Sequence, residues 1–210
     1  MSVIKGLRAA TARSPTIRKA VTVGSLAAVG GLAVGEDVQS VARKLSAVDR
    51  CIEILSDSMA KLPSFVIDNR SRERLPHDIL YLLNVRPNEA MTPFVRKKVL
   101  ETSRLEGGNG YDWIIRDPST GLPKELIPVP WQLVQQWHDE IGRIWYDITH
   151  PLTGELMRLP NEDVCHYKNA TRNGLKGIGT LSRAEDVIAA ARAAQQYDAS
   201  YYQNGGQPGG

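Results

Sequence analysis

Cysteine is scarce in this sequence: the 210 residues include 2 cysteines, Cys51 and Cys165, which lie far apart. A disulfide framework and a cysteine-built zinc site both need closely spaced cysteines, so neither is expected. The scarcity also suits a reducing compartment. With 42% hydrophobic and 23% charged residues, the chain has an ordinary globular composition, which excludes a wholly disordered or collagen-like protein.

The sequence also lacks a strongly charged body. The formal net charge is +3, but the first 45 residues hold seven basic and two acidic side chains, so the other 165 residues sum to −2. A protein that binds nucleic acid over its whole surface is therefore not indicated, although a basic arm could contact phosphates. We expect residues 1–45 to form a flexible basic arm.

Long hydrophobic runs are missing as well. Residues 20–35 are 16 uncharged residues interrupted by glycines, which is short of the roughly 20 apolar residues that span a bilayer. Five basic residues precede this run, and small residues stand at Ala33 and Gly35, as before a signal-peptide cleavage site. A secreted or membrane-anchored protein, with residues 1–35 as its signal, is therefore kept as an alternative to the arm.

Helical periodicity dominates the chain as far as residue 108. Ser46 and Asp49 resemble a capping box that opens a helix ending at Pro63. Its apolar face is expected to consist of Val48, Ile52, Leu55, Met59 and Leu62. A strand over 64–68, a polar turn and a short helix over 77–84 follow. Thr92 and Pro93 then begin a longer helix that ends at 107–108, with Val95, Val99, Thr102 and Leu105 on one face.

The pattern then changes to short β-type runs separated by turn sequences. These runs cover residues 111–117, 124–130, 133–137, 143–149, 155–159 and 164–168. Ile144, Tyr146 and Ile148 alternate with polar or amphipathic neighbours, as in a half-buried strand. An alanine-rich helix over 181–202 and a glycine-rich end over 204–210 complete the chain. The prediction is an α+β fold with N-terminal helices, a central antiparallel β meander and a long C-terminal helix.

A glycine-rich loop before the last helix is the one feature that suggests nucleotide chemistry. Gly174, Gly179 and Thr180 have the outer spacing of a phosphate-binding loop. Ile178 precedes Gly179, however, and no lysine precedes Thr180, so the group that reaches the β- and γ-phosphates is missing. A nucleotide-binding enzyme using loop 174–180 is kept as an alternative, and a plain connection is preferred.

Three other groups of residues suggest chemistry only weakly. His138, Asp139 and Glu140 adjoin at a turn, where their side chains diverge and lack a third metal ligand. Cys165 and His166 are neighbours on a strand, so they face opposite sides of a sheet, and Cys165 is expected to pack in the core. Aromatic anchors of a core or a subunit interface are expected at Trp131, Trp137 and Trp145. No catalytic, cofactor-binding or metal-ligating residue is predicted, and no DNA-binding residue is assigned.

Taken in order, the segments from about residue 36 to residue 210 resemble the portal proteins of long-tailed double-stranded DNA bacteriophages. The family's arginine-proline-asparagine, helix, and glycine-asparagine-x-tyrosine pattern is met by residues 86–88 and 108–111. Segments 45–68, 124–135, 159–169 and 174–210 match further blocks in the same order. Gly110 and Asp112 depart from the small and apolar residues that the family tends to have, and Gly179-Thr180 replaces a frequent serine-proline helix start.

The resemblance implies a structural protein and not an enzyme. Portal subunits form a ring, usually of twelve, at one capsid vertex, where double-stranded DNA is packaged and later ejected. Implied partners are the large terminase, a head–tail adaptor, the major capsid or scaffolding protein and the DNA; no cofactor or small-molecule substrate is implied. The location implied is the virion, and the host cytoplasm during assembly.

The resemblance also implies that this chain corresponds to part of a portal subunit. Family members are roughly twice as long, so residues 46–203 are expected to form the wing-like domain. Residues 204–210 would then connect to a stem and clip beyond residue 210. Because those contacts are missing, we expect the 210-residue chain alone to form rings weakly or not at all. Alanines 184, 191, 194 and 199 of the last helix would allow close packing within or between subunits.

Overall fold

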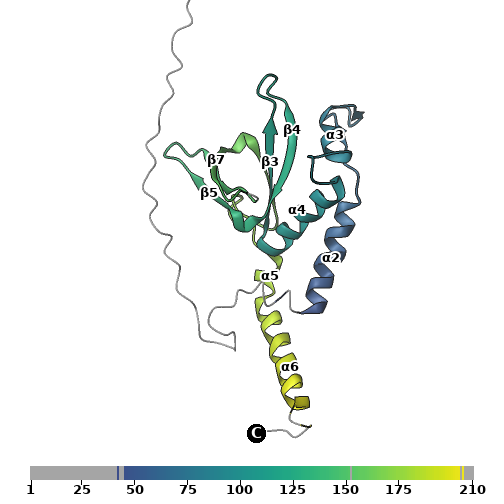
Figure 1. The fold of residues 1–210 in the computed structure, drawn as a ribbon, viewed down its shortest axis with the longest axis vertical. Coiled ribbons are helices and arrows are strands. Elements are labelled where there is room, and N and C mark those ends of the chain that lie inside the picture. Colours follow the sequence, from purple (N-terminus) through teal and green to yellow (C-terminus); the bar gives the residue numbers. More distant parts are fainter. Residues whose placement is uncertain (1–41, 43–44, 152, 204, 206–210) are drawn as a thin grey trace, which may run out of the picture.

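The structure is a computed structural model that describes residues 42, 45–151, 153–203 and 205 (Figure 1). The expected basic arm lies outside the described residues except for Ala42 and Leu45, and the glycine-rich end does so except for Gly205. The alternative signal segment, residues 1–35, lies wholly outside them. Among the described helices, none is both long and apolar enough to cross a membrane.

Three helices form one layer of the molecule: α2 (Ser46–Ala60), α3 (Ile79–Asn84) and α4 (Pro93–Gly107) (Figure 1). The start of α4 is as predicted, because Thr92 Oγ1 accepts a hydrogen bond from the Val95 backbone N–H and Pro93 occupies the first turn. The predicted capping box of α2 is wrong: its N-cap is Leu45, which makes no side-chain cap, and Ser46 already lies inside the helix.

The buried faces of α2 and α4 are rotated from the predicted ones. In α2 the buried residues are Ile52, Ser56 and Ala60, whereas the predicted core residues Leu55, Met59 and Leu62 are 52%, 50% and 55% exposed. In α4 the buried residues are Arg96, Leu100, Glu101, Ser103, Leu105 and Glu106. Of the predicted α4 face only Leu105 is buried. Polar side chains face inward here because each meets a partner that periodicity cannot identify.

The strands form two three-stranded antiparallel sheets and one short hairpin. The central sheet has the order β4-β3-β8, and the second has the order β5-β6-β7. The strand bounds are β3 (Asn109–Arg116), β4 (Pro123–Val129), β5 (Val134–His138), β6 (Ile144–Thr149), β7 (Leu156–Pro160) and β8 (Val164–Lys168). The meander is therefore limited to β5–β7, because β8 returns to pair with β3. The two-residue strands β1 (Val66–Ile67) and β2 (Arg74–Leu75) form the hairpin.

Strand β3 lies at the centre of the molecule, between the helical layer and the β5–β7 sheet. One of its faces contributes Tyr111 to a core shared with both sheets, whose buried members are Tyr111, Val129, Tyr146, Ile148 and Val164. Its other face lies against α4, as the central position of β3 between the α4 and β5–β7 layers in Figure 1 indicates. The predicted alternation in β6 is confirmed, because Tyr146 and Ile148 are 1% and 0% exposed.

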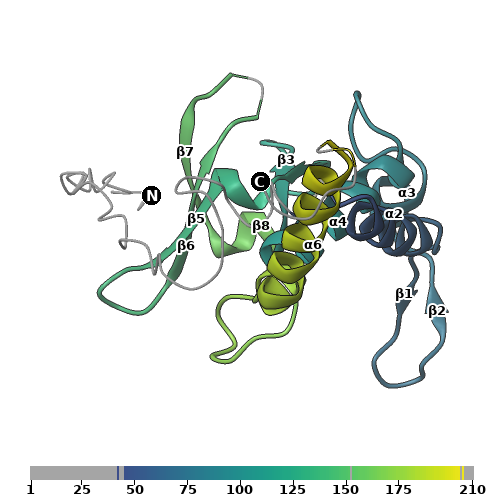
Figure 2. The same cartoon turned by 90° about the horizontal axis from the view of Figure 1, so that it is seen from below.

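The C-terminal helical segment is broken once, at Ala184, into α5 (Thr180–Arg183) and α6 (Glu185–Gln203). Leu181 and Ile188 pack with Ala42, Leu45, Ile52 and Leu105 in a second core cluster. Most of α6 extends away from the body of the molecule (Figure 1), and seen from below it lies in front of the other elements (Figure 2). The predicted α+β class, with its leading helices, antiparallel strands and long last helix, is confirmed.

The core between the two sheets supplies the first testable prediction. Ile148→Ala is expected to lower the free energy of unfolding by about 2–5 kcal/mol, because it leaves a cavity at a fully buried site. Ile141→Ala is the matched control, since Ile141 is 79% exposed at a hairpin, and it is expected to change stability by less than about 0.5 kcal/mol. Urea denaturation of both variants measures the difference, and equal costs would contradict the assignment of this core.

Candidate functional site

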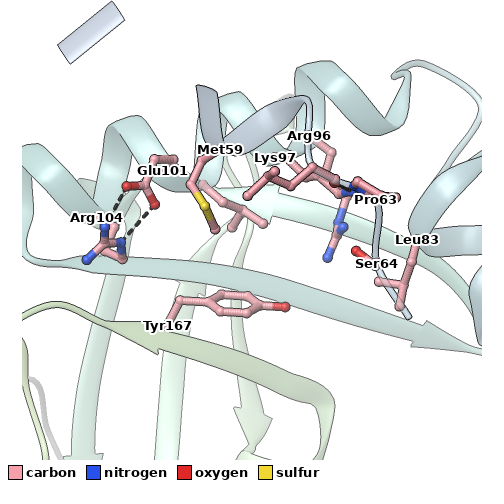
Figure 3. A pocket seen from close by; sticks show the side chains of 11 residues that line it. Met59, Pro63, Ser64, Leu83, Arg96, Lys97, Glu101, Arg104 and Tyr167 are labelled. Carbon is pink, nitrogen blue, oxygen red and sulfur yellow. Dashed lines mark hydrogen bonds and ion pairs between the residues drawn. The ribbon is translucent and has the colours of Figure 1, made fainter. Parts of the chain in front are cut away.

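A cavity of about 360 Å³ lies between the end of α2, the end of α3, helix α4 and strand β8 (Figure 3). Met59 points into it from above and the ring of Tyr167 forms its opposite wall (Figure 3). The other lining residues are Leu62, Pro63, Ser64, Leu83, Arg96, Lys97, Leu100, Glu101 and Arg104. The cavity is therefore apolar in its middle and flanked by charged side chains of α4.

Each charged side chain at this cavity already binds a protein group. Lys97 Nζ donates to the Leu62 carbonyl oxygen at 2.6 Å, and burial lowers the pKa of Lys97 from its usual value. Arg104 donates to both Glu101 carboxylate oxygens and, at 2.9 Å, to Asn169 Oδ1. These groups connect α4 to the Pro63 loop and to the end of β8. Their role is therefore to stabilise the fold.

The third charged group, Arg96, forms a buried ion pair with Asp112 of β3. The Arg96 Nε–Asp112 Oδ1 distance is 3.1 Å, a second bond joins Arg96 Nη2 to Asp112 Oδ2, and the residues are 2% and 0% exposed. The Tyr167 hydroxyl donates to Asp112 Oδ2 at 3.4 Å. Burial raises the pKa of the Asp112 carboxyl, and the Arg96 guanidinium opposes that rise. The pair fixes the angle at which α4 crosses the central sheet.

Asp112 is one of the positions at which the sequence departs from the portal pattern, and the structure shows how a carboxylate is accommodated there. A carboxylate at a fully buried strand position needs a cation, and Arg96 lies one helix earlier in the chain. Sequence reasoning noted Asp112 but missed Arg96, because an arginine on an amphipathic helix is ordinarily a surface residue.

A second buried polar group, Asn109, joins α4, β8 and the glycine-rich loop. Asn109 Oδ1 accepts from the Gly177 N–H at 2.7 Å and lies 2.9 Å from His166 Nε2, while Asn109 Nδ2 donates to the Gly107 and Gly177 carbonyls. His166 also stacks on Tyr111 with ring centroids 4.4 Å apart. Burial lowers the pKa of His166 to about 4, so the ring is neutral at physiological pH.

The glycines of loop 174–180 serve close packing against α4. A Cβ on Gly177 would lie 1.9 Å from the Gly108 carbonyl oxygen, and one on Gly179 would lie 2.1 Å from the Glu106 carbonyl oxygen. The Gly177 and Ile178 N–H groups donate to Asn109 and to the Ala170 carbonyl. Of the other members of the candidate phosphate loop, Gly174 has open space around it, and Thr180 lines an apolar groove beside α2. The glycines of this loop are therefore explained by close backbone packing against the end of α4. Nothing in the structure favours the nucleotide-binding alternative.

The residues His138, Asp139 and Glu140 do not come together as a site. Asp139 instead organises the β5–β6 hairpin, accepting hydrogen bonds from the Ile141 and Arg143 N–H groups and from the Trp145 indole. No cluster of metal-ligating side chains occurs in the part of the chain that the structure describes.

Cys165 and His166 face opposite sides of β8, as predicted. His166 points toward Tyr111 and Tyr146, whereas Cys165 stands opposite Asp112. The expectation that Cys165 packs in the core is wrong, because this residue is exposed with a free thiol. The reason is the register: β8 lies at the edge of its sheet, and Cys165 is on the face that α4 covers only in part.

The three tryptophans are anchors of the fold. Trp131 belongs to the partly buried rim of the core between the sheets, and its backbone N–H donates to Ser103 Oγ. Trp137 and Trp145 are cross-strand neighbours that stack with centroids 6.1 Å apart. Arg158 lies 4.2 Å over the Trp137 ring and also binds Asp147. These contacts tie β5, β6 and β7 together.

The buried ion pair leads to a prediction about stability. Asp112→Asn is expected to lower the free energy of unfolding by about 3–5 kcal/mol, because it leaves the buried Arg96 guanidinium without a counter-ion. The double variant Arg96→Met/Asp112→Leu removes both charges and is expected to recover most of that loss. Chemical denaturation of the variants gives the three values. An Asp112→Asn variant within about 1 kcal/mol of the parent would show that the pair is not needed.

The glycine contacts lead to a second prediction. Gly177→Ala is expected to cost about 2–3 kcal/mol, because its Cβ would overlap the Gly108 carbonyl oxygen. Gly174→Asn is the control: Gly174 has a φ of 74° with open space around it, and asparagine tolerates that conformation at a cost below about 1 kcal/mol. Thermal unfolding ranks the two variants, and the reverse ranking would refute the close contact.

Solved structures share this fold. The chain superimposes on a protein in the virion of a native gene transfer agent particle with a TM-score of 0.65, 21% identity and coverage of 82% of this chain and 47% of the other. For the neck of the native gene transfer agent particle computed with C12 symmetry, the TM-score is 0.61 and the identity 20%, with coverage of 83% of this chain and 47% of the other. For an HK97 family phage portal protein from Corynebacterium diphtheriae, the TM-score is 0.55 and the identity 24%, with coverage of 81% of this chain and 52% of the other.

This chain therefore spans about half the length of the solved proteins that it matches. No curated protein sequence matches it significantly. The family model described as phage portal protein, however, matches residues 46–210, from the start of α2 onward. Since that match covers more than half of the sequence, the chain belongs to the phage portal protein family.

Proposed function

We propose that this chain is the wing portion of a portal subunit, which assembles with identical subunits into a ring at one vertex of a virion. The observation that carries the proposal is the match of the portal family model to residues 46–210. A particle neck with C12 symmetry among the structures of similar fold supports a ring of about twelve subunits. The proposed role is structural and conductive, with double-stranded DNA passing inward during packaging and outward during ejection.

The surface of the subunit supports assembly. Large apolar side chains are exposed over α2, the β1–β2 hairpin, α3 and the start of α4. They are Ile54, Met59, Leu62, Phe65, Ile67, Leu75, Tyr81, Val85, Phe94 and Val95. Monomeric proteins rarely expose so much contiguous apolar surface, so these residues are expected to be buried against a neighbouring molecule. A head-to-tail contact that closes after a fixed number of subunits would bury them once in every copy.

The remaining partners follow from the same proposal. The ring docks the large terminase while DNA enters, contacts the major capsid or scaffolding protein, and later binds a head–tail adaptor. Assembly takes place in the host cytoplasm and the product is part of the virion. A subunit with a near-neutral body suits a channel protein, because many phosphate contacts would retain the DNA in a salt-dependent manner.

Mass photometry tests the proposal. The portal protein translated from a reading frame that extends beyond residue 210 is expected to form closed rings of about twelve subunits, because stem and clip contacts would add to those of the wing. The 210-residue chain is expected to remain mainly at its monomer mass of 23.1 kDa at micromolar concentration. A longer protein that is strictly monomeric under the same conditions would contradict the portal proposal. Stable rings formed by the 210-residue chain would contradict the expectation that stem and clip contacts are needed.

A further inference from the structure

An apolar groove runs along the N-terminal part of α2, between α2, α4 and the α5–α6 segment. It holds about 290 Å³ and is lined by apolar residues of three helical segments, with Cys51 and Thr180 at its edge. The lining residues are Ala47, Val48, Cys51, Ile52, Leu55, Leu105, Thr180, Leu181, Ala184, Val187 and Ile188. We call it the α2 groove. No charged side chain lines it, and Leu55 and Val187 on its walls are 52% and 71% exposed.

Two residues that precede α2 belong to the core cluster beside this groove. Ala42 and Leu45 are 0% and 5% exposed and belong to the same core cluster as Ile52, Leu105 and Ile188. Ala42 and Leu45 are thus packed beside the groove, and the chain that precedes α2 is anchored there. The match to the portal family model begins at residue 46, so residues 1–45 lie outside it.

Residues 20–35 of the arm have the chemistry that such a groove binds. All 16 are uncharged, and most are alanine, valine, leucine or glycine. Six residues lie between Gly35 and Ala42, so the link spans at most about 25 Å when extended, which is longer than the roughly 10 Å of α2 between Val48 and Leu55. A tether of this length gives an apolar segment an effective local concentration of roughly millimolar.

The dimensions of the groove favour a peptide segment over a small molecule. Small-molecule sites usually enclose about 300–1,000 Å³ and carry a few convergent polar groups, whereas this groove is open and lined almost entirely by apolar groups. Small apolar side chains can fill it one after another along α2. We propose that residues 20–35 dock in the α2 groove of their own chain and cover Leu55 and Val187. This docking does not require ring assembly.

Cysteine cross-linking tests the docking, because Cys51 lines the groove and carries a free, exposed thiol. In a Cys165→Ala background, single cysteines are placed along the arm as Ala27→Cys, Val29→Cys, Leu32→Cys or Val34→Cys. At least one is expected to form a disulfide with Cys51 about tenfold faster than Ala10→Cys, the control in the basic part of the arm. A disulfide requires Cα atoms within about 7 Å, so the rate reports the position directly. Intact mass without reduction identifies the intramolecular product.

A pair of groove variants provides a second measurement. Leu55→Asp places a charge in the groove and is expected to slow that cross-link at least about fivefold, because the segment then meets a solvated carboxylate. Ile54→Asp is the matched control: Ile54 is adjacent and 51% exposed but does not line the groove, so the rate should be unchanged. Circular dichroism establishes that both variants fold, and both sites are exposed enough to tolerate the change.

Two outcomes would overturn the docking. One is that no cysteine within residues 20–35 reacts with Cys51 faster than Ala10→Cys does. The other is a disulfide that appears only at the mass of two chains, which would mean that a second copy occupies the groove. Either result is read from the disulfide products by intact mass and does not depend on ring formation, so it is separate from the ring measurement that tests the portal function.

Discussion

Strand β3 is covered on both faces, and the rest of the molecule follows from that constraint. On one face Tyr111 enters the core between the two sheets, and on the other Asp112 lies against α4 at 0% exposure. A carboxylate in that position is tolerated because Arg96 binds it through two nitrogens. The ion pair thereby sets how α4 crosses the sheet, and α4 in turn sets where α2 lies.

Close backbone contacts fix the other end of α4. Gly108 closes the helix in the left-handed region, with a φ of 79°, and its carbonyl group touches Gly177. Asn109 binds the same loop through both ends of its side-chain amide. The loop can therefore pass close under α4 and deliver the chain into α5. This packing explains why a glycine-rich sequence precedes the last helices. Because glycine has no side chain, the backbone of the loop can approach the backbone at the end of α4.

The surface left over by these contacts is where function is to be sought. Apolar side chains of α2, α3 and the β1–β2 hairpin are exposed in the subunit, and α6 projects beyond the body (Figure 1). A ring subunit has to leave such surfaces open until it meets its neighbours. The α2 groove lies beside them, and its cover by the N-terminal segment would shield one apolar surface while the others remain available for assembly.

The sequence by itself determined the class of fold, the ends of α4, the positions of the strands and the family. These features depend on local signals: Thr92-Pro93 before α4, Gly108 after it, and side-chain alternation around Tyr146. Only the tertiary structure decided the pairing of β8 with β3, the inward face of α4 and the exposure of Leu55, Met59 and Cys165. Periodicity reveals that a face is apolar, but whether that face is buried depends on partners distant in the chain. The Arg96–Asp112 pair joins a helix and a strand whose local patterns are independent of each other. The burial of each charge is therefore explained only by the contact between them in the folded molecule.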